Sequence, residues 1–223
     1  SSGCYPAALL TDPWLQVMSV VVTGAAGFLG NRLAQNLAKR GAQVVLCDQI
    51  EPPVVPAGGR ALVGPLEETL GAAIASDTRA VVHLAAVVSS GAERDFDLGY
   101  RVNVDSLRGT LEACRARCAQ PPKFVFASSL AVFGAVPHAD DNTPTTPLNS
   151  YGTQKAIGEL LVNDYSRKGF VEVSLRKARW GIHRTSPDLS RTTRAWLGLA
   201  ASEGACTLAL LPTRSSSKVL SPL

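Results

Sequence analysis

The chain has 223 residues, of which 46% are hydrophobic and 18% are charged. This composition is typical of a globular protein and excludes disordered and fibrous classes. No apolar run approaches the roughly 18 residues that a membrane-spanning helix needs, and residues 1–31 lack the Lys and Arg of a secretory or transit signal, so we expect a cytoplasmic protein without a membrane partner. The length predicts one domain and part of a second.

The formal net charge of +4 is unevenly distributed along the chain. Residues 1–176 hold 15 Lys and Arg against 16 Asp and Glu, whereas residues 177–223 hold 7 against 2. A nucleic-acid interface needs a basic face on a folded module, and the long first segment has no excess of basic residues. We therefore expect no nucleic-acid partner.

Short apolar runs alternate with longer helix-periodic stretches between residues 19 and 176. The runs predict six strands at Ser19–Thr23, Gln43–Asp48, Arg60–Val63, Ala80–Leu84, Lys123–Ser129 and Val171–Leu175. Helices are expected at Gly27–Lys39, near Glu67–Ala75, at Asp95–Arg117 and at Ser150–Lys168. Because the strands are continuously apolar, both faces of the sheet should be buried, which predicts an α/β fold with a doubly wound parallel sheet.

A glycine-rich turn, Thr23-Gly24-Ala25-Ala26-Gly27-Phe28-Leu29-Gly30, joins the first expected strand to the first helix. Gly24 permits a tight turn, Gly27 lets the backbone approach a pyrophosphate, and Gly30 allows close packing of helix on strand. The phosphates would meet free amides at the positive end of the helix. In this context the turn predicts a dinucleotide site, and a plain turn is the alternative.

Asp48 closes the second expected strand, 18 residues after Gly30. Its carboxylate can accept hydrogen bonds from the adenosine ribose hydroxyls and would repel a 2′-phosphate. No Lys or Arg follows in residues 49–51 to offset that repulsion, so we expect NAD rather than NADP. The alternative is an acidic residue that only caps the strand.

A second group of polar residues lies at Ser128-Ser129, after the fifth expected strand, and at Tyr151 and Lys155 in the next helix. Tyr and Lys four residues apart share a helical face, so the ammonium can favour ionisation of the phenol. Without that help a phenol with a pKa of about 10 is a poor base at neutral pH. Ser129 can hydrogen-bond the reacting oxygen. An exposed helix face is the alternative for this pair.

These motifs resemble the N-terminal cofactor domain of the extended short-chain dehydrogenase/reductase family, in its NAD-dependent epimerase/dehydratase group. The matching runs, in chain order, are the glycine turn, His83-Leu84-Ala85-Ala86, Arg101-Val102-Asn103-Val104, Ser128-Ser129-Leu130-Ala131-Val132-Phe133-Gly134 and Tyr151-Gly152-Thr153-Gln154-Lys155. Within the family, the run from Ser150 to Glu159 is most similar to D-erythronate dehydrogenases, which oxidise a four-carbon hydroxy acid with NAD.

The resemblance implies an NAD-dependent oxidoreductase that oxidises a secondary alcohol of a small, sugar-acid-like molecule. Tyr151 would be the general base, Lys155 would hold the nicotinamide ribose and lower the Tyr151 pKa, and Ser129 would orient the substrate. The implied NAD-binding residues are Gly24, Gly27, Phe28, Leu29, Gly30, Asp48, Leu66, Leu84, Ala85, Ala86, Asn103, Tyr151 and Lys155. We expect His83 to be a strand residue with a satisfied hydrogen bond rather than a catalytic imidazole, and we expect no metal.

Three features depart from the family pattern. Pro65 stands where an acidic residue near the adenine is usual, and Phe133 stands where Tyr is common. After Arg176 nothing resembles the nicotinamide-side loop or the substrate domain. We therefore keep an alternative function, a non-catalytic NAD-binding module from a truncated or frame-shifted epimerase/dehydratase.

Three segments are expected from these patterns. Residues 1–17 precede the single methionine, Met18, and form an N-terminal extension; residues 18–176 form the NAD-binding Rossmann-type domain; residues 177–223 form an unassigned basic tail. The tail arises either from a shifted reading frame, alternative splicing or a truncated gene model, or it is a divergent, partly helical cap. A missing substrate domain would expose apolar surface, so association into a homodimer is expected.

Overall fold

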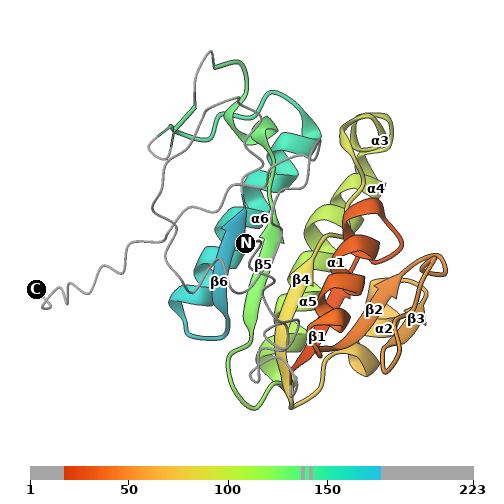
Figure 1. Ribbon diagram of the computed structural model, residues 1–223. Helices are drawn as coiled ribbons and strands as arrows, with labels where there is room; N and C mark the ends of the chain where they lie inside the picture. Colours follow the sequence, from red (N-terminus) through yellow and green to blue (C-terminus); the bar gives the residue numbers. More distant parts are fainter. Residues whose placement is uncertain (1–17, 137–138, 141–142, 177–223) are drawn as a thin grey trace, which may run out of the picture.

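Six parallel strands form one sheet. The computed structural model describes residues 18–136, 139–140 and 143–176, so the expected extension 1–17 and tail 177–223 lie outside the described residues. The strands are β1 (Ser19–Thr23), β2 (Gln43–Asp48), β3 (Arg60–Val63), β4 (Thr78–His83), β5 (Lys123–Ala127) and β6 (Glu172–Arg176). Their order is β3-β2-β1-β4-β5-β6, and each neighbouring pair is parallel (Figure 1).

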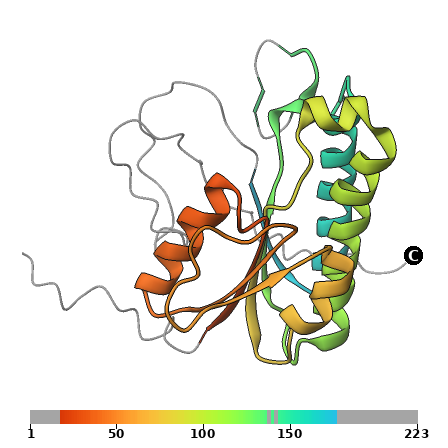
Figure 2. The ribbon, with the colours of Figure 1, turned by 90° about the vertical axis from the view of Figure 1, so that its right-hand side faces the viewer.

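Helices cover both faces of this sheet. Helix α1 (Phe28–Lys39) lies on one face, and α2 (Leu66–Ala73), α5 (Ser106–Arg117) and α6 (Ser150–Arg167) lie on the other (Figure 2). Each crossover connection brings the chain back to the end of the sheet where the previous strand began. The carboxyl termini of all six strands therefore lie together at the opposite end. The predicted α/β class with a doubly wound parallel sheet is confirmed.

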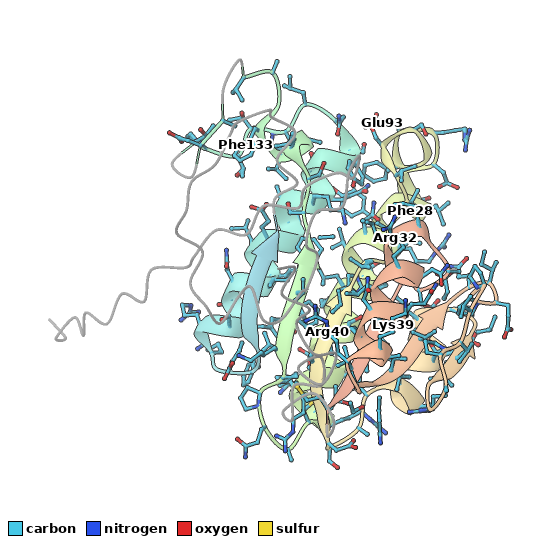
Figure 3. All side chains as sticks on the ribbon, viewed as in Figure 1. Phe28, Arg32, Lys39, Arg40, Glu93 and Phe133 are labelled. Carbon is cyan, nitrogen blue, oxygen red and sulfur yellow. The ribbon has the colours of Figure 1, made fainter. Side chains whose placement is uncertain are left out.

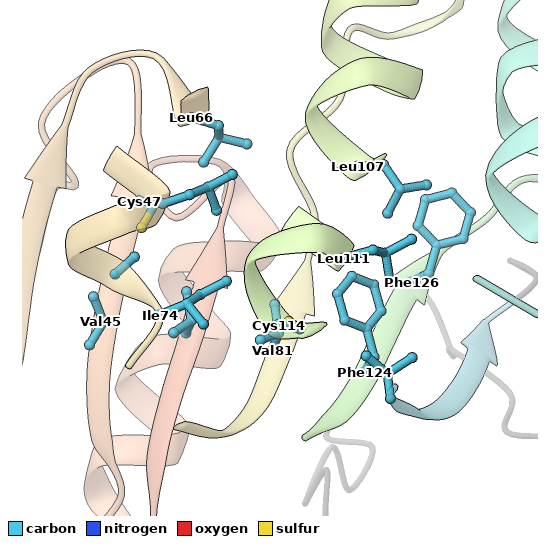
Figure 4. Packing of buried hydrophobic residues seen from close by; sticks show 14 of the residues in the cluster. Val45, Cys47, Leu66, Ile74, Val81, Leu107, Leu111, Cys114, Phe124 and Phe126 are labelled. Atoms are coloured by element: carbon cyan, nitrogen blue, oxygen red, sulfur yellow. The ribbon is translucent and has the colours of Figure 1, made fainter. Parts of the chain in front are cut away.

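Two apolar clusters hold the helices to the sheet. The cluster under α1 includes Val20, Val22, Leu33, Leu37 and Leu46. The cluster on the opposite face includes Val21, Val81, Leu107, Leu111, Phe124 and Phe126 (Figure 4). Neighbouring residues of β1 thus enter different clusters, which is why its sequence is continuously apolar rather than alternating. Each of these side chains contributes about 1.5–3 kcal/mol through burial.

The expected long helix at 95–117 is interrupted. Its first turns are α4 (Phe96–Tyr100), a π-helical turn follows at Arg101–Asp105, and only then does α5 begin. Asp95 has extended backbone, and its Oδ1 accepts the Leu98 amide at 2.9 Å, so it caps α4 instead of joining it. A further short helix, α3 (Ser89–Arg94), precedes this cap and was not expected.

Strand β5 ends two residues earlier than expected. It stops at Ala127, whereas the apolar pattern extends it to Ser129. Ser129 is the N-cap of a 3-10 helix at Leu130–Phe133, and its Oγ accepts the Ala131 amide at 3.2 Å. A serine that bonds its own backbone locally competes with the strand ladder, which explains the early end.

Close packing of α6 on β5 depends on Gly158. A Cβ at this position would lie 2.6 Å from Phe126 Cζ and 3.0 Å from Leu107 Cδ2. We predict that Gly158→Ala lowers the free energy of unfolding by about 1–3 kcal/mol through overpacking, despite the better helix propensity of alanine. Denaturant unfolding monitored by circular dichroism measures the change.

The matched control is Gly71→Ala in α2, where a Cβ would meet nothing within 4 Å. This variant should be more stable than the parent by up to about 1 kcal/mol. Equal stability of Gly158→Ala and the parent would show that α6 does not need this close approach.

Candidate active site

The glycine turn places the start of α1 beside the loop that follows β4. Gly24 has a φ of 70°, and a Cβ there would lie 2.7 Å from the Ala85 amide nitrogen, so both conformation and space require glycine. A Cβ on Gly30 would collide with the Gly24 carbonyl oxygen, so α1 packs directly against the turn. Gly27, the N-cap of α1, makes no side-chain capping bond, which leaves the first amides of the helix open to an anion.

Two exposed side chains border this turn. Phe28 is 75% exposed, and the guanidinium carbon of Arg32 lies 5.5 Å from its ring centroid. Figure 3 shows Phe28, Glu93 and Phe133 toward one end of the domain, where the strands terminate, and Lys39 farther along α1. Arg32 therefore adds positive charge beside the open amides. Sequence reasoning missed it, although its spacing of four residues from Phe28 was visible.

Asp48 ties the end of β2 to the glycine turn. Its Oδ2 accepts the Ala26 amide at 2.9 Å, and its Oδ1 accepts the Gln49 amide at 2.7 Å. The carboxylate is thus held at the edge where a ribose beside the turn would lie. None of the three residues that follow Asp48 in the sequence is basic.

Leu66 lies in the apolar core. Its side chain is 8% exposed and belongs to the cluster that includes Leu70 and Ile74. Pro65 is the N-cap of α2, and the Gly64 amide donates to the Asp48 carbonyl at 2.9 Å. The backbone of this segment is thus bonded to the end of β2. The predicted role of Leu66 in NAD binding stays a prediction.

The segment Leu84–Ala86 is fastened to β1. The Leu84 amide donates to the Thr23 carbonyl at 3.1 Å, and the Ala85 amide donates to Thr23 Oγ1 at 3.3 Å. Thr23 thus fixes the segment beside the glycine turn, where the resemblance placed it. The sequence offered a weak signal for this role, since Thr23 is the polar residue at the end of an apolar strand.

His83 is a buried strand residue. Its Nδ1 lies 3.1 Å from Thr23 Oγ1, and its ring lies 6.3 Å from the rings of both Phe124 and Phe126. Burial, with a smaller contribution from the charge of Lys155, lowers its pKa to about 3, so the imidazole is neutral. Within the described ranges its Nε2 has no hydrogen-bond partner, so the expected satisfied hydrogen bond exists at one nitrogen.

Asn103 supports the site from inside the π-helical turn. Its Oδ1 accepts the Val87 amide at 2.8 Å, and its Nδ2 donates to the Val87 carbonyl at 3.0 Å and to Gln154 Oε1 at 2.7 Å. The buried amide therefore links the loop after β4 to α6. Gln154, which lies between Tyr151 and Lys155 in the sequence, was missed because nothing in its spacing indicated an inward position.

Lys155 is buried against the end of β5. It is 2% exposed, its Nζ donates to the Ala127 carbonyl at 3.0 Å, and the nitrogen lies 4.9 Å from the Phe126 ring centroid and 5.8 Å from that of Tyr151. Burial lowers the pKa of Lys155 to about 8. The cation–π contacts and the carbonyl offset part of that desolvation.

Ser129, Tyr151 and Lys155 converge at the carboxyl edge of the sheet. Burial raises the pKa of Tyr151 above its ordinary value, and a hydrogen bond with Ser129 lowers it in part. The expected lowering of this pKa by Lys155 stays a prediction, since burial and Ser129 are the causes of the shift in the chain without NAD. The arrangement can still hold a substrate oxygen between two hydroxyl groups beside a buried cation.

Neither a metal centre nor a membrane helix is visible in the described part of the chain. Residues 18–136, 139–140 and 143–176 contain no group of three or more His, Cys, Asp or Glu side chains that could hold an ion. The helices of these same ranges include none that is long and apolar enough to cross a bilayer.

Comparison with family models finds one match, described as the NAD dependent epimerase/dehydratase family, over residues 20–198. The matched range extends past Arg176, although the sequence motifs showed no resemblance to the family after that residue. D-erythronate dehydrogenase from Cupriavidus necator is 47% identical over 171 residues, covering 70% of this chain and 52% of that protein. The protein of the same name from Haemophilus influenzae is 45% identical over 167 residues, with the same coverage. The chain thus spans about half the length of these curated relatives.

Solved structures agree with the observed fold. MoeE5 in complex with UDP-glucose and NAD is 30% identical, with a TM-score of 0.64, over 72% of this chain and 53% of that one. The nucleoside-diphosphate-sugar epimerase from Agrobacterium tumefaciens is 37% identical, with a TM-score of 0.63, over 85% of this chain and 59% of that one.

The lowered pKa of Lys155 predicts a pH-dependent stability. Its charged form is disfavoured in the folded state, so the penalty is fully present below about pH 8 and is relieved as pH rises toward the ordinary value of 10.5. We predict that this group adds about 2 kcal/mol to the free energy of unfolding between pH 7 and pH 9.5. Denaturant unfolding at both pH values measures it.

Lys155→Met should lose this pH-dependent gain, and Lys168→Met, at an exposed position, should retain it. An identical gain in the parent and in Lys155→Met would mean that the buried ammonium does not carry the effect.

Proposed function

The chain belongs to the NAD dependent epimerase/dehydratase family, and on that premise we propose that its described part is the NAD-binding and catalytic portion of a dehydrogenase that oxidises a secondary alcohol of a small sugar acid. The observation that carries the proposal is the convergence of Ser129, Tyr151 and Lys155 at the same sheet edge as the glycine turn and Asp48. This convergence supports the proposal of an acid–base group beside a dinucleotide cradle.

The residues at the edge fit NAD. The open amides at the start of α1, with Arg32 nearby, suit the pyrophosphate. The Asp48 carboxylate, already held by the Ala26 amide, suits the hydroxyls of an adenosine ribose and disfavours a 2′-phosphate. Leu84, Ala85 and Ala86 would line the adenosine side. When bound, NAD supplies the hydride acceptor of the reaction.

Tyr151 takes the hydroxyl proton of the substrate in the proposed reaction. Ser129 donates a hydrogen bond to the same oxygen as it becomes a carbonyl, and so holds it at the phenol. Lys155 favours the phenolate by its charge, and it uses one donor on Ala127 while keeping others for a nicotinamide ribose. The Tyr151 pKa, raised by burial, must fall in the complete complex for the base to act near neutral pH.

D-erythronate is the substrate that the relatives suggest. Two curated relatives at 47% and 45% identity carry the name D-erythronate dehydrogenase. The run from Ser150 to Glu159 resembles the same subgroup. We propose an oxidation of D-erythronate or a related hydroxy acid. The homodimer and the cytoplasmic location stay predictions.

A second function is favoured by one observation. Burial raises the pKa of Tyr151, which leaves less of the phenol ionised near neutral pH. A non-catalytic NAD-binding module fits the cofactor edge equally well. Turnover distinguishes the two, because both functions require NAD binding and one requires proton transfer at Tyr151.

We predict that the purified chain binds NAD and produces NADH with D-erythronate or another member of a panel of sugar acids and alcohols. Tyr151→Phe should abolish turnover and leave the NAD dissociation constant within about twofold, because only the hydroxyl is removed. Tyr165→Phe, at the other end of α6, is the matched control and should keep turnover. Absorbance of NADH and calorimetric titration of NAD provide the two readouts.

NAD binding by the parent without turnover of any panel member would favour the non-catalytic module. Absence of NAD binding would contradict both functions. Turnover that survives in Tyr151→Phe would show that another group is the base.

A further inference from the structure

A buried hydrogen bond joins the residue before Ser129 to the catalytic helix. The Ser128 hydroxyl donates to Glu159 Oε1 at 2.5 Å. Ser128 is 7% exposed and Glu159 is 6% exposed, so both groups are removed from bulk water. A buried hydroxyl and carboxyl that bond each other define their relative position more strictly than exposed groups do, because neither has water as a ready substitute.

The bond lies where the sheet no longer holds the chain. The last pair of the β5–β6 ladder includes Ala127, and the 3-10 helix begins at Leu130. Ser128 and Ser129 are thus in the short connection between two regular elements. Both are linked to α6, Ser128 through Glu159 and Ser129 through Tyr151.

Glu159 follows Lys155 by one helical turn on α6. The same stretch of helix meets β5 at two more points, through the Lys155 ammonium on the Ala127 carbonyl and through Gly158 against Phe126. The Ser128 bond extends this line of contacts by one residue toward Ser129. Because Ser128 directly precedes Ser129, a small displacement of Ser128 would move the Ser129 hydroxyl relative to the Tyr151 phenol.

We propose that Glu159 and Ser128 are positioning residues for the reaction: their hydrogen bond holds Ser129 at the Tyr151 hydroxyl. The inference rests on the proposed function for its kinetic consequences. Neither residue is assigned contact with the substrate or NAD. Removing the bond should reduce the rate of the chemical step and leave cofactor binding intact, because the glycine turn and Asp48 lie on other strands.

The effect on pH dependence has a definite sign. The hydrogen bond from Ser129 lowers the pKa of Tyr151, so displacement of Ser129 raises that pKa. In the oxidation direction the base must be ionised, so the limb of kcat that rises with pH moves to higher pH. Lys155 on the same helix lies near the Tyr151 ring, Glu93 of α3 accepts the neighbouring Ser150 amide, and Glu159 follows Lys155 by one turn. Every variant below keeps Lys155 and Glu93, and Ser128→Ala also keeps Glu159.

The test compares Ser128→Ala and Glu159→Ala with Glu159→Gln and with Ser76→Ala, an exposed serine before β4, at the opposite end of the sheet. We expect the first two to lose about tenfold in kcat, with KM for NAD within twofold and the rising limb at higher pH. Glu159→Gln keeps a carbonyl acceptor for Ser128 and should stay within about threefold of the parent. Ser76→Ala should match the parent.

Unchanged kcat and an unchanged limb in Ser128→Ala would overturn the inference. A loss that follows lower thermal stability and weaker NAD binding, with the limb in place, would also overturn it, since that is the signature of a structural role alone.

A second readout does not depend on turnover. The pKa of Tyr151 can be followed through the 13Cζ resonance of tyrosine-labelled protein, assigned by its absence in Tyr151→Phe. It should rise in Ser128→Ala and Glu159→Ala but not in Ser76→Ala, and an unchanged value would overturn the inference. If the parent shows no turnover, the proposed function fails, and this titration still decides the role of Ser128 and Glu159.

Discussion

Burial of one ammonium group constrains the whole site. Lys155 is 2% exposed, and its ammonium contacts the Ala127 carbonyl and the rings of Phe126 and Tyr151. To reach Ala127 and Phe126, α6 must lie against β5, which Gly158 permits because it has no side chain to hold the helix away. Once α6 is in this position, Tyr151 lies one turn before Lys155 and meets Ser129. The same packing of α6 on β5 that buries the Lys155 charge, at a cost in free energy, also brings the Tyr151 phenol to Ser129.

The cofactor edge depends on a second constraint, the shared direction of the strands. Because β1, β2 and β4 are parallel, Gly24, Asp48 and Ala85 follow their carboxyl ends and meet at one edge. Thr23 and Asp48 then join the three loops through backbone amides. The same topology brings the end of β5 to this edge, where α6 adds Tyr151 and Lys155.

The sequence was sufficient where local rules decide. Continuous apolar runs predicted the parallel sheet, and the glycine spacing located the turn into α1. It was insufficient where long-range contacts decide: Asn103, in a π-helical turn, bonds Val87 and also Gln154, which lies 51 residues farther along the chain. Ser128 meets Glu159 across 31 residues, which no periodicity encodes. The sign of the Tyr151 pKa shift was also beyond the sequence, since it follows from burial.

The site at the carboxyl ends of β1, β2 and β4 should be selective for NAD. Calorimetric titration of the parent chain with NAD and with NADP tests it most directly, with Asp48→Asn as the comparison. We expect binding of one NAD per chain, weaker binding of NADP, and a smaller difference between the two affinities in Asp48→Asn, because the carboxylate charge that repels the 2′-phosphate is removed. Equal affinities for the two cofactors in the parent, or no binding of either, would contradict it.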